Sequence, residues 1–105
     1  MARVLVASLA DDDMAAILTD IAREAGTSAA LRYYHRFERL LDRLARHPAI
    51  GAPRPALGPD TRIGVVAPYV VIYDYDRDAD AVMILRVMHG RRDRAIAALS
   101  KRQSP

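Results

Sequence analysis

The sequence predicts an α+β fold: a two-layer sandwich in the order β-α-α-β-β-β, with a helical hairpin packed on one face of a mainly antiparallel sheet. Two apolar patterns of helical period occur between residues 14 and 46, and almost nothing separates them. Three short apolar runs with short connections follow, which is typical of an antiparallel meander. A chain of 105 residues has the size of one domain, so we expect residues 1–105 to form a single unit.

The N-terminal half is expected to supply the first strand and both helices. An apolar run with β-branched residues from Arg3 to Ser8 predicts a strand. The three aspartates at positions 11–13 suit the N-terminal end of a helix, where the helix dipole favours carboxylates. Gly26 is expected to end this helix, and a second helix to run from Thr27 or Ser28 to about Arg46.

The second helix is amphipathic, and its polar face carries a stripe of arginines that Glu38 and Asp42 partly balance. Its apolar stripe is Ala30, Tyr34, Phe37, Leu40, Leu41 and Leu44. The opposite face carries Arg32, Arg36, Arg39, Arg43 and Arg46, in alternating steps of four and three. This basic stripe is either a solvated face or a docking surface for an acidic partner or a nucleic acid.

The C-terminal half is expected to supply the rest of the sheet. Residues 47–60 hold four prolines and two glycines, which indicates ordered turns rather than helix or strand. Strands are predicted from Thr61 to Val66, from Tyr69 to Tyr75 and from Ala81 to Met88, with an acidic hairpin between the last two. Residues 91–102 are expected to form a short helix or a tail.

Strand alternation predicts which side chains face the helices. The helix-facing set is Ile63, Val65, Val70, Ile72, Met83, Leu85 and Val87. The other face would carry Arg62, Gly64, Val66, Tyr69, Val71, Tyr73, Tyr75, Val82, Ile84, Arg86 and Met88, with His89, Arg91 and Arg92 at its rim. Three interpretations of that face stay open: it binds RNA or another polyanion, it is covered by an inhibitory partner, or Arg86 pairs with a carboxylate such as Asp74 and the tyrosines cover the sheet.

Composition excludes several classes of protein. The chain has no cysteine, so disulfides and thiolate metal sites are ruled out. The N-terminal apolar run is too short for a signal peptide, and no run approaches the roughly 20 apolar residues of a membrane helix. We therefore expect a cytoplasmic protein with no membrane contact, no metal and no cofactor. His35 and His47 are expected at the surface.

Two stretches resemble a known family. ILRVMHGRRD, residues 84–93, is similar to the end of ParE toxins in the RelE/ParE superfamily of bacterial type II toxin–antitoxin systems. Residues 47–76 also resemble these toxins, through a His-Pro turn, a Gly-x-Pro-Arg-Pro loop, an Arg that opens the next strand, and a Tyr-Val strand. The β-α-α-β-β-β order is that of the superfamily as well.

The resemblance implies a toxin that causes growth arrest or stabilises a plasmid and that a small cognate antitoxin neutralises. ParE-like members poison DNA gyrase, whereas RelE-like members cut messenger RNA on the ribosome. The expected partner is an acidic, ParD-like antitoxin in a hetero-oligomer with the toxin. Either four arginines of the basic stripe (Arg32, Arg36, Arg39 and Arg43) or the face with Arg62 and Arg86 could bind it.

The residues favour a binding protein over a nuclease. Cleavage through the RNA 2′-hydroxyl needs a base, an acid and a cation for the phosphate. The chain offers His89, Arg86, Arg62 and Tyr73, but no partner base is evident. We therefore expect a gyrase inhibitor whose contact surface is Arg62, Arg86, His89, Arg91 and Arg92. A ribosome-dependent mRNA endonuclease is the alternative, and an inactive relic that only binds its antitoxin is a third possibility.

Overall fold

The structure is a computed structural model that describes residues 1–90, and it has the predicted α+β architecture. The elements are β1 (Arg3–Val6), α1 (Ser8–Ala25), α2 (Thr27–Arg46), β2 (Ala52–Pro53), β3 (Thr61–Val66), β4 (Tyr69–Asp76) and β5 (Ala81–His89). The predicted helical tail at residues 91–102 lies outside the described residues. Within residues 1–90, neither helix has the length and apolarity that a bilayer crossing requires.

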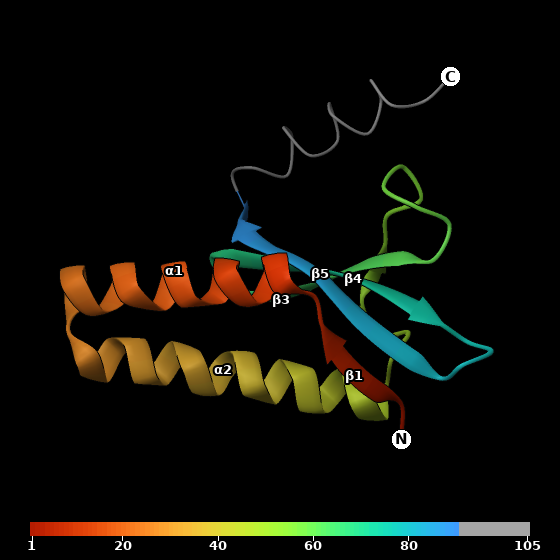
Figure 1. The fold of residues 1–105 in the computed structure, drawn as a ribbon, viewed down its shortest axis with the longest axis horizontal. Coiled ribbons are helices and arrows are strands. Elements are labelled where there is room, and N and C mark those ends of the chain that lie inside the picture. Colours follow the sequence, from red (N-terminus) through yellow and green to blue (C-terminus); the bar gives the residue numbers. More distant parts are fainter. Residues whose placement is uncertain (91–105) are drawn as a thin grey trace.

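The two helices form a hairpin that lies against one side of a five-stranded mixed sheet (Figure 1). The strand order is β1-β5-β4-β3-β2. β1 runs parallel to β5, and all the other neighbours are antiparallel. Gly26 joins the helices with φ of +93°, a conformation that glycine adopts without steric cost, so the chain reverses within a single residue.

The start of the chain and the proline-rich loop differ from the prediction. The first strand ends at Val6 rather than Ser8, and α1 already begins at Ser8, so the aspartates at 11–13 lie inside the helix instead of capping it. Asp11 still lies in the first turn, where the dipole favours its charge. Residues 47–60 also contain a short strand, β2, which pairs with β3. Proline is tolerated there because β2 is an edge strand.

The sheet faces are the reverse of those predicted for β3 and β4. The core beside the helices contains Tyr69, Val71, Tyr73 and Tyr75 from β4, packed with Phe37, Leu40 and Leu44 from α2. On β3, Val66 is part of this core, and a Cβ on Gly64 would lie 3.1 Å from Leu40, whereas Val65 is 63% exposed. The tyrosines therefore form part of the interior and not an open platform.

The predicted facing of β5 is right for Val87 and wrong for the residues that precede a β-bulge. Ile72 pairs with Arg86 and Tyr73 pairs with Ile84, so Leu85 has no partner on β4. Such an extra residue breaks the strict alternation of side chains along a strand. As a result Val82, Ile84 and Val87 all lie in the core, although their spacing places them on opposite faces of a regular strand.

The Asp13 carboxylate fastens α1 to β5. It accepts hydrogen bonds from the Arg86 Nε at 2.8 Å, the Arg86 Nη2 at 3.1 Å and the Val87 backbone N–H at 3.0 Å. β1 pairs with β5 only as far as Ile84, so this carboxylate supplies a partner where the strand edge would otherwise lack one. Burial opposes ionisation of Asp13, but these hydrogen bonds outweigh it and lower its pKa.

A second anchor holds the proline-rich loop. The Tyr73 side chain is fully buried, and its hydroxyl donates to the Pro48 carbonyl at 2.8 Å and accepts from the Gly51 N–H at 2.9 Å. A Cβ on Gly51 would come within 2.6 Å of that hydroxyl, so only glycine fits there without a shift of the backbone or the ring. The Arg62 Nη1 adds hydrogen bonds to the carbonyls of Ala49 and Gly51.

Replacing Asp13 by Asn is expected to lower the free energy of unfolding by about 1–3 kcal/mol at pH 7, because charge-assisted hydrogen bonds are lost. The pKa of Asp13 is lowered in the folded state, so its contribution is complete above the unfolded value and disappears as the pH falls through the folded value. Urea unfolding at several pH values measures both effects. Asp12→Asn, at the exposed neighbouring position, is the control. A gap between Asp13→Asn and wild type that stays constant down to pH 2 would contradict this account.

Replacing Tyr73 by Phe is expected to cost about 1–3 kcal/mol, because the buried Gly51 N–H and the Pro48 carbonyl lose their partner. Tyr34→Phe, at a 44% exposed tyrosine, should change stability by less than about 0.5 kcal/mol. Thermal and urea denaturation measure the difference. Equal stability of the two variants would show that the tyrosine hydroxyl does not hold the loop.

Candidate functional site

Two of the residues expected on an open contact surface are part of the loop anchor. Tyr73 is 0% exposed and its hydroxyl is fully engaged. Arg62 is half-buried and donates to two backbone carbonyls of the loop that follows α2. Burial raises the pKa of the Tyr73 hydroxyl, so it stays protonated near neutral pH and is a poor general base.

Arg86 has a different partner from the one considered in the sequence. It pairs with Asp13, 73 residues away, and not with Asp74. The Asp74 carboxylate instead accepts a hydrogen bond from the Thr61 hydroxyl across β3 and β4. The hydrogen bond to Asp13 raises the pKa of the Arg86 guanidinium, and 41% of that side chain remains exposed. Arg86 is therefore a fixed cation with one face open to solvent.

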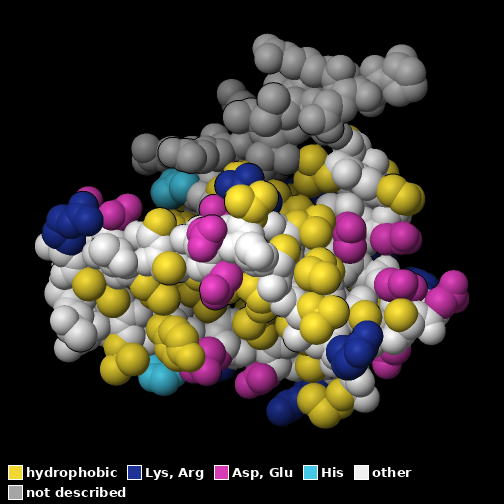
Figure 2. All heavy atoms as spheres, in the orientation of Figure 1, with side chains coloured by type: hydrophobic (Ala, Val, Ile, Leu, Met, Phe, Trp, Pro, Cys, Tyr) yellow, Lys and Arg dark blue, Asp and Glu magenta, His cyan; other side chains and the backbone are white. Residues whose placement is uncertain are grey.

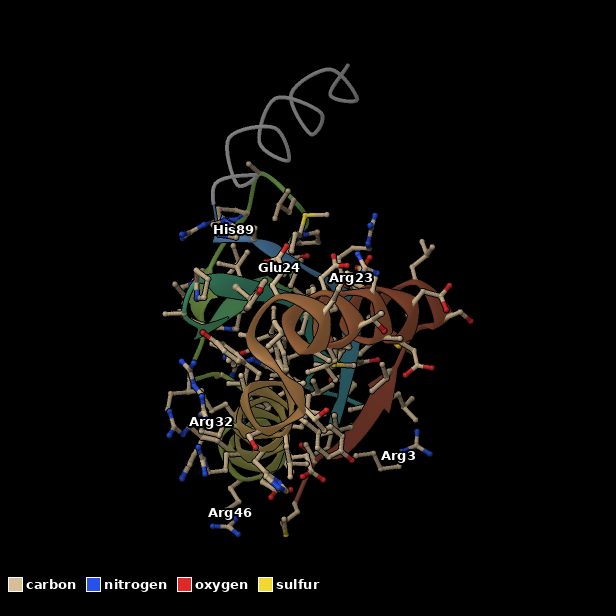
Figure 3. All side chains as sticks on the ribbon, turned by 90° about the vertical axis from the view of Figure 1, so that its left-hand side faces the viewer. Arg3, Arg23, Glu24, Arg32, Arg46 and His89 are labelled. Atoms are coloured by element: carbon tan, nitrogen blue, oxygen red, sulfur yellow. The ribbon has the colours of Figure 1, made fainter. Side chains whose placement is uncertain are left out.

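His89 and Arg86 do come together, in a cavity of about 420 Å³ between α1 and the end of β5. The ring centroids of His89 and Tyr69 are 5.8 Å apart at an interplanar angle of 77°, an edge-to-face contact. The α1 side of the cavity is lined by three carboxylates: Asp13, Asp20 and Glu24. Figure 3 shows Glu24 and His89 on the same side of the molecule.

The electrostatics of this cavity are mixed. Burial raises the pKa of the Tyr69 hydroxyl, and the neighbouring Tyr33, Glu24 and Asp20 raise it further. The carboxylates of the cavity wall disfavour the binding of an anion, while Arg86 favours it. The cavity can therefore hold a proton donor and acceptor next to a cation, but its α1 side repels phosphates.

Within residues 1–90, α2 carries a row of arginines that make no salt bridge. We call Arg32, Arg36, Arg39 and Arg43 the Arg row. Three of these side chains are exposed and Arg36 is half-buried, with its guanidinium carbon 4.9 Å from the centre of the Tyr33 ring. Among residues 1–90, salt bridges join Arg23 to Asp20 and Arg86 to Asp13, and a His35 ring nitrogen lies 3.1 Å from a Glu38 carboxylate oxygen; none of these contacts involves the Arg row.

An apolar groove lies between the two helices, on a different side of α2 from the Arg row. It is lined by Val6, Met14, Ala15, Leu18, Tyr34, Phe37 and Leu41, with Asp11 and Glu38 at its edge. Leu31, one helical turn before Tyr34, is also exposed, at 54%. Figure 2 shows hydrophobic side chains over both helices. A monomer exposes such a patch mainly where a partner binds.

The other predicted residues lie outside the described part of the chain or at its surface. Arg91 and Arg92 lie outside the described residues. His35 and His47 are exposed, as expected. Within the described part of the chain, no group of three histidine or carboxylate side chains is arranged to hold a metal ion.

Sequence reasoning missed the acidic wall of the His89 cavity and the role of Asp13. A signal for the wall was present: Asp13, Asp20 and Glu24 recur at intervals of seven and four, which places them on one face of α1. Nothing in the sequence indicates that this face meets the end of β5, because that contact depends on the tertiary packing of the hairpin.

A family model matches most of the chain. Residues 4–94 match the family model described as "ParE toxin of type II toxin-antitoxin system, parDE". No curated protein sequence matches. A solved structure of the chromosomal ParDE toxin–antitoxin system from P. aeruginosa is similar, with a TM-score of 0.70 and 21% identity over 85% of this chain and 96% of that one.

The toxin–antitoxin complex RelBE2 from Mycobacterium tuberculosis is also similar, with a TM-score of 0.57 and 24% identity over 84% of this chain and 96% of that one. At these identities the two structures show a shared fold. The family model covers most of the chain and carries the assignment. The chain belongs to the ParE toxin family of type II toxin–antitoxin systems.

Proposed function

We propose that this toxin acts by inhibiting DNA gyrase and that it does not cut RNA. One observation carries the choice: two of the four residues available for RNA cleavage, Tyr73 and Arg62, are bound into the loop anchor. A nuclease needs its base, acid and cation around one phosphate. The match to the ParE family model supports the same target class.

The proposed target-binding surface centres on His89 and the open side of Arg86, at the end of β5. The guanidinium of Arg86 is held in one orientation by Asp13, so little rotamer entropy would be lost on binding. Arg91 and Arg92 follow directly in the sequence and extend the cationic character. Arg62 belonged to the predicted surface, but its hydrogen bonds to the loop limit it to a supporting role.

Purified toxin at micromolar concentration is expected to inhibit ATP-dependent supercoiling by gyrase or to trap cleaved DNA. His89→Ala should raise the concentration needed for half-inhibition about tenfold, the loss of roughly 1.4 kcal/mol of binding. His35→Ala, at an exposed histidine on α2, is the matched control and should behave as wild type. Absence of both inhibition and trapped DNA would refute the gyrase proposal.

A second function is favoured by one specific observation, the cavity that holds His89, Arg86 and Tyr69 together with the carboxylates of Asp13, Asp20 and Glu24. Asp20 or Glu24 supplies the partner base that the sequence did not reveal. In this alternative the protein is a ribosome-dependent mRNA endonuclease. Cuts in translated mRNA by primer extension, lost together with toxicity in His89→Ala, would establish it and displace the gyrase proposal.

We further propose that an acidic antitoxin binds the Arg row in a hetero-oligomer in the cytoplasm. The row carries four cations that no carboxylate among residues 1–90 neutralises. Complementary charge would speed association and suppress wrong partners. The other surface considered in the sequence, around Arg62 and Arg86, is less available because both side chains already have internal partners.

Arg39→Glu is expected to weaken antitoxin binding at least tenfold and to slow association most, because a rim charge acts mainly on the on-rate. Surface plasmon resonance with the cognate antitoxin measures both rates. Leu31→Asp, near the apolar groove, is the comparison variant. If Leu31→Asp abolishes binding while Arg39→Glu leaves it intact, the antitoxin binds the groove and the proposal for the Arg row fails.

A further inference from the structure

The Arg row has the geometry of a linear array of cations. At about 100° per residue, positions 32, 36, 39 and 43 fall within about 60° of arc on α2. At 1.5 Å per residue, neighbouring members are roughly 4.5–6 Å apart along the axis, and the row is about 16 Å long. Figure 3 looks along the helices and shows Arg32 and Arg46 on the side of α2 away from Arg3.

Beside the row lies a hollow of about 150 Å³, enclosed between α2 and the end of β3. Arg36, Arg39 and Arg43 line it together with Leu40, Val65 and Val66. Its volume is below the roughly 300–1,000 Å³ of small-molecule pockets, so it admits a chemical group and not a whole ligand. Guanidinium groups bind phosphate oxygens in a bidentate way, so the hollow suits one phosphate of a larger polymer whose other phosphates run along the row.

The surroundings of the row favour a duplex over single-stranded nucleic acid. Proteins that bind single strands offer aromatic rings on which bases stack. The Tyr33 ring is covered by Arg36 and packs edge-to-face on Tyr69, with centroids 5.8 Å apart, and the exposed His35 and Tyr34 rings pack edge-to-face on each other. With these rings already in contact, the row offers charge more than a stacking platform, which fits backbone phosphates and no base readout.

We propose that the Arg row binds the phosphate backbone of duplex DNA independently of base sequence. The inference extends the proposed function, because a toxin that acts on gyrase would be held on the DNA that gyrase carries. An acidic antitoxin on the same row would compete with that DNA, so neutralisation would include its displacement. The four guanidinium groups predict about four phosphate contacts per bound toxin.

Fluorescence anisotropy of the full chain with a labelled 20-base-pair duplex tests this directly, without gyrase. The slope of log affinity against log salt concentration is expected to be about −3.6 for four phosphates. Arg39→Gln should reduce its magnitude by about 0.9. The triple variant Arg36→Gln, Arg39→Gln and Arg43→Gln should bind at least tenfold more weakly, with a slope magnitude lower by about 2.7.

The matched control removes three positive charges elsewhere, by Arg3→Gln, Arg23→Gln and Arg77→Gln. Both triple variants have the same net charge, and circular dichroism verifies that both fold. An equal loss of binding in the two variants would overturn the proposal, because net charge alone would then explain it. No binding of wild type at 50 mM salt, or at least tenfold tighter binding to the matching single strand, would overturn it as well.

A poly-glutamate peptide of matched charge separates nucleic acid from an acidic protein partner. If the Arg row binds this peptide and not the duplex, the row is an acidic-protein surface and the inference is wrong. The supercoiling assay separates duplex binding by the Arg row from inhibition of gyrase. Duplex binding through the row without gyrase inhibition supports this inference and refutes the proposed function, whereas inhibition without duplex binding does the reverse.

Discussion

The hydrogen bonds of Asp13 are the constraint on which the arrangement of α1 depends. β1 is only four residues long, so β5 continues past it without a neighbouring strand. The N–H of Val87 is exposed to this gap, and a carboxylate from α1 takes the place of the missing strand. Because the same carboxylate binds two nitrogens of Arg86, one side chain both ends the sheet edge and sets the position of the helix beside it.

This arrangement explains why Arg86 could not be interpreted from its strand alone. In the sequence, a cation within an apolar run suggests either an exposed polyanion site or a local partner such as Asp74. The partner is instead on the first helix, 73 residues away, and the contact exists only because β1 and α1 follow each other along β5. Long-range pairs of this kind depend on topology, which local spacing does not encode.

Apart from the short edge strand β2, the elements themselves were predictable, because each has a local cause. Gly26 separates two helical periods, the prolines of residues 47–60 exclude a long strand or helix, and the last three strands are apolar runs divided by turns. The facing of the strands was not predictable in the same way. β4 is apolar on both sides, so Val70 and Ile72 are as plausible in the core as Val71 and Tyr73.

Because of the bulge at Leu85, strand alternation does not predict which side chains of β5 face the helices. Val82 and Ile84 share a face with Val87 only because one residue of β5 is unpaired. The consequence for function is large, since the error turned buried tyrosines into a supposed binding platform. Once Tyr73 is assigned to the loop anchor, the residues left for contact with partners lie at the end of β5 and on α2.

Those two surfaces differ in how their charge is balanced, and this difference bears on what each could bind. At the end of β5, Arg86 is paired with Asp13 and the cavity wall adds Asp20 and Glu24, so the field there is local and short in range. On α2 the Arg row has no counterion among residues 1–90, so its potential extends into solvent to about a Debye length of 8–10 Å. In the proposed function, the Arg row would therefore steer a polyanion, while the end of β5, where Asp13 fixes Arg86 and His89 packs on Tyr69, would make the selective contact with the target.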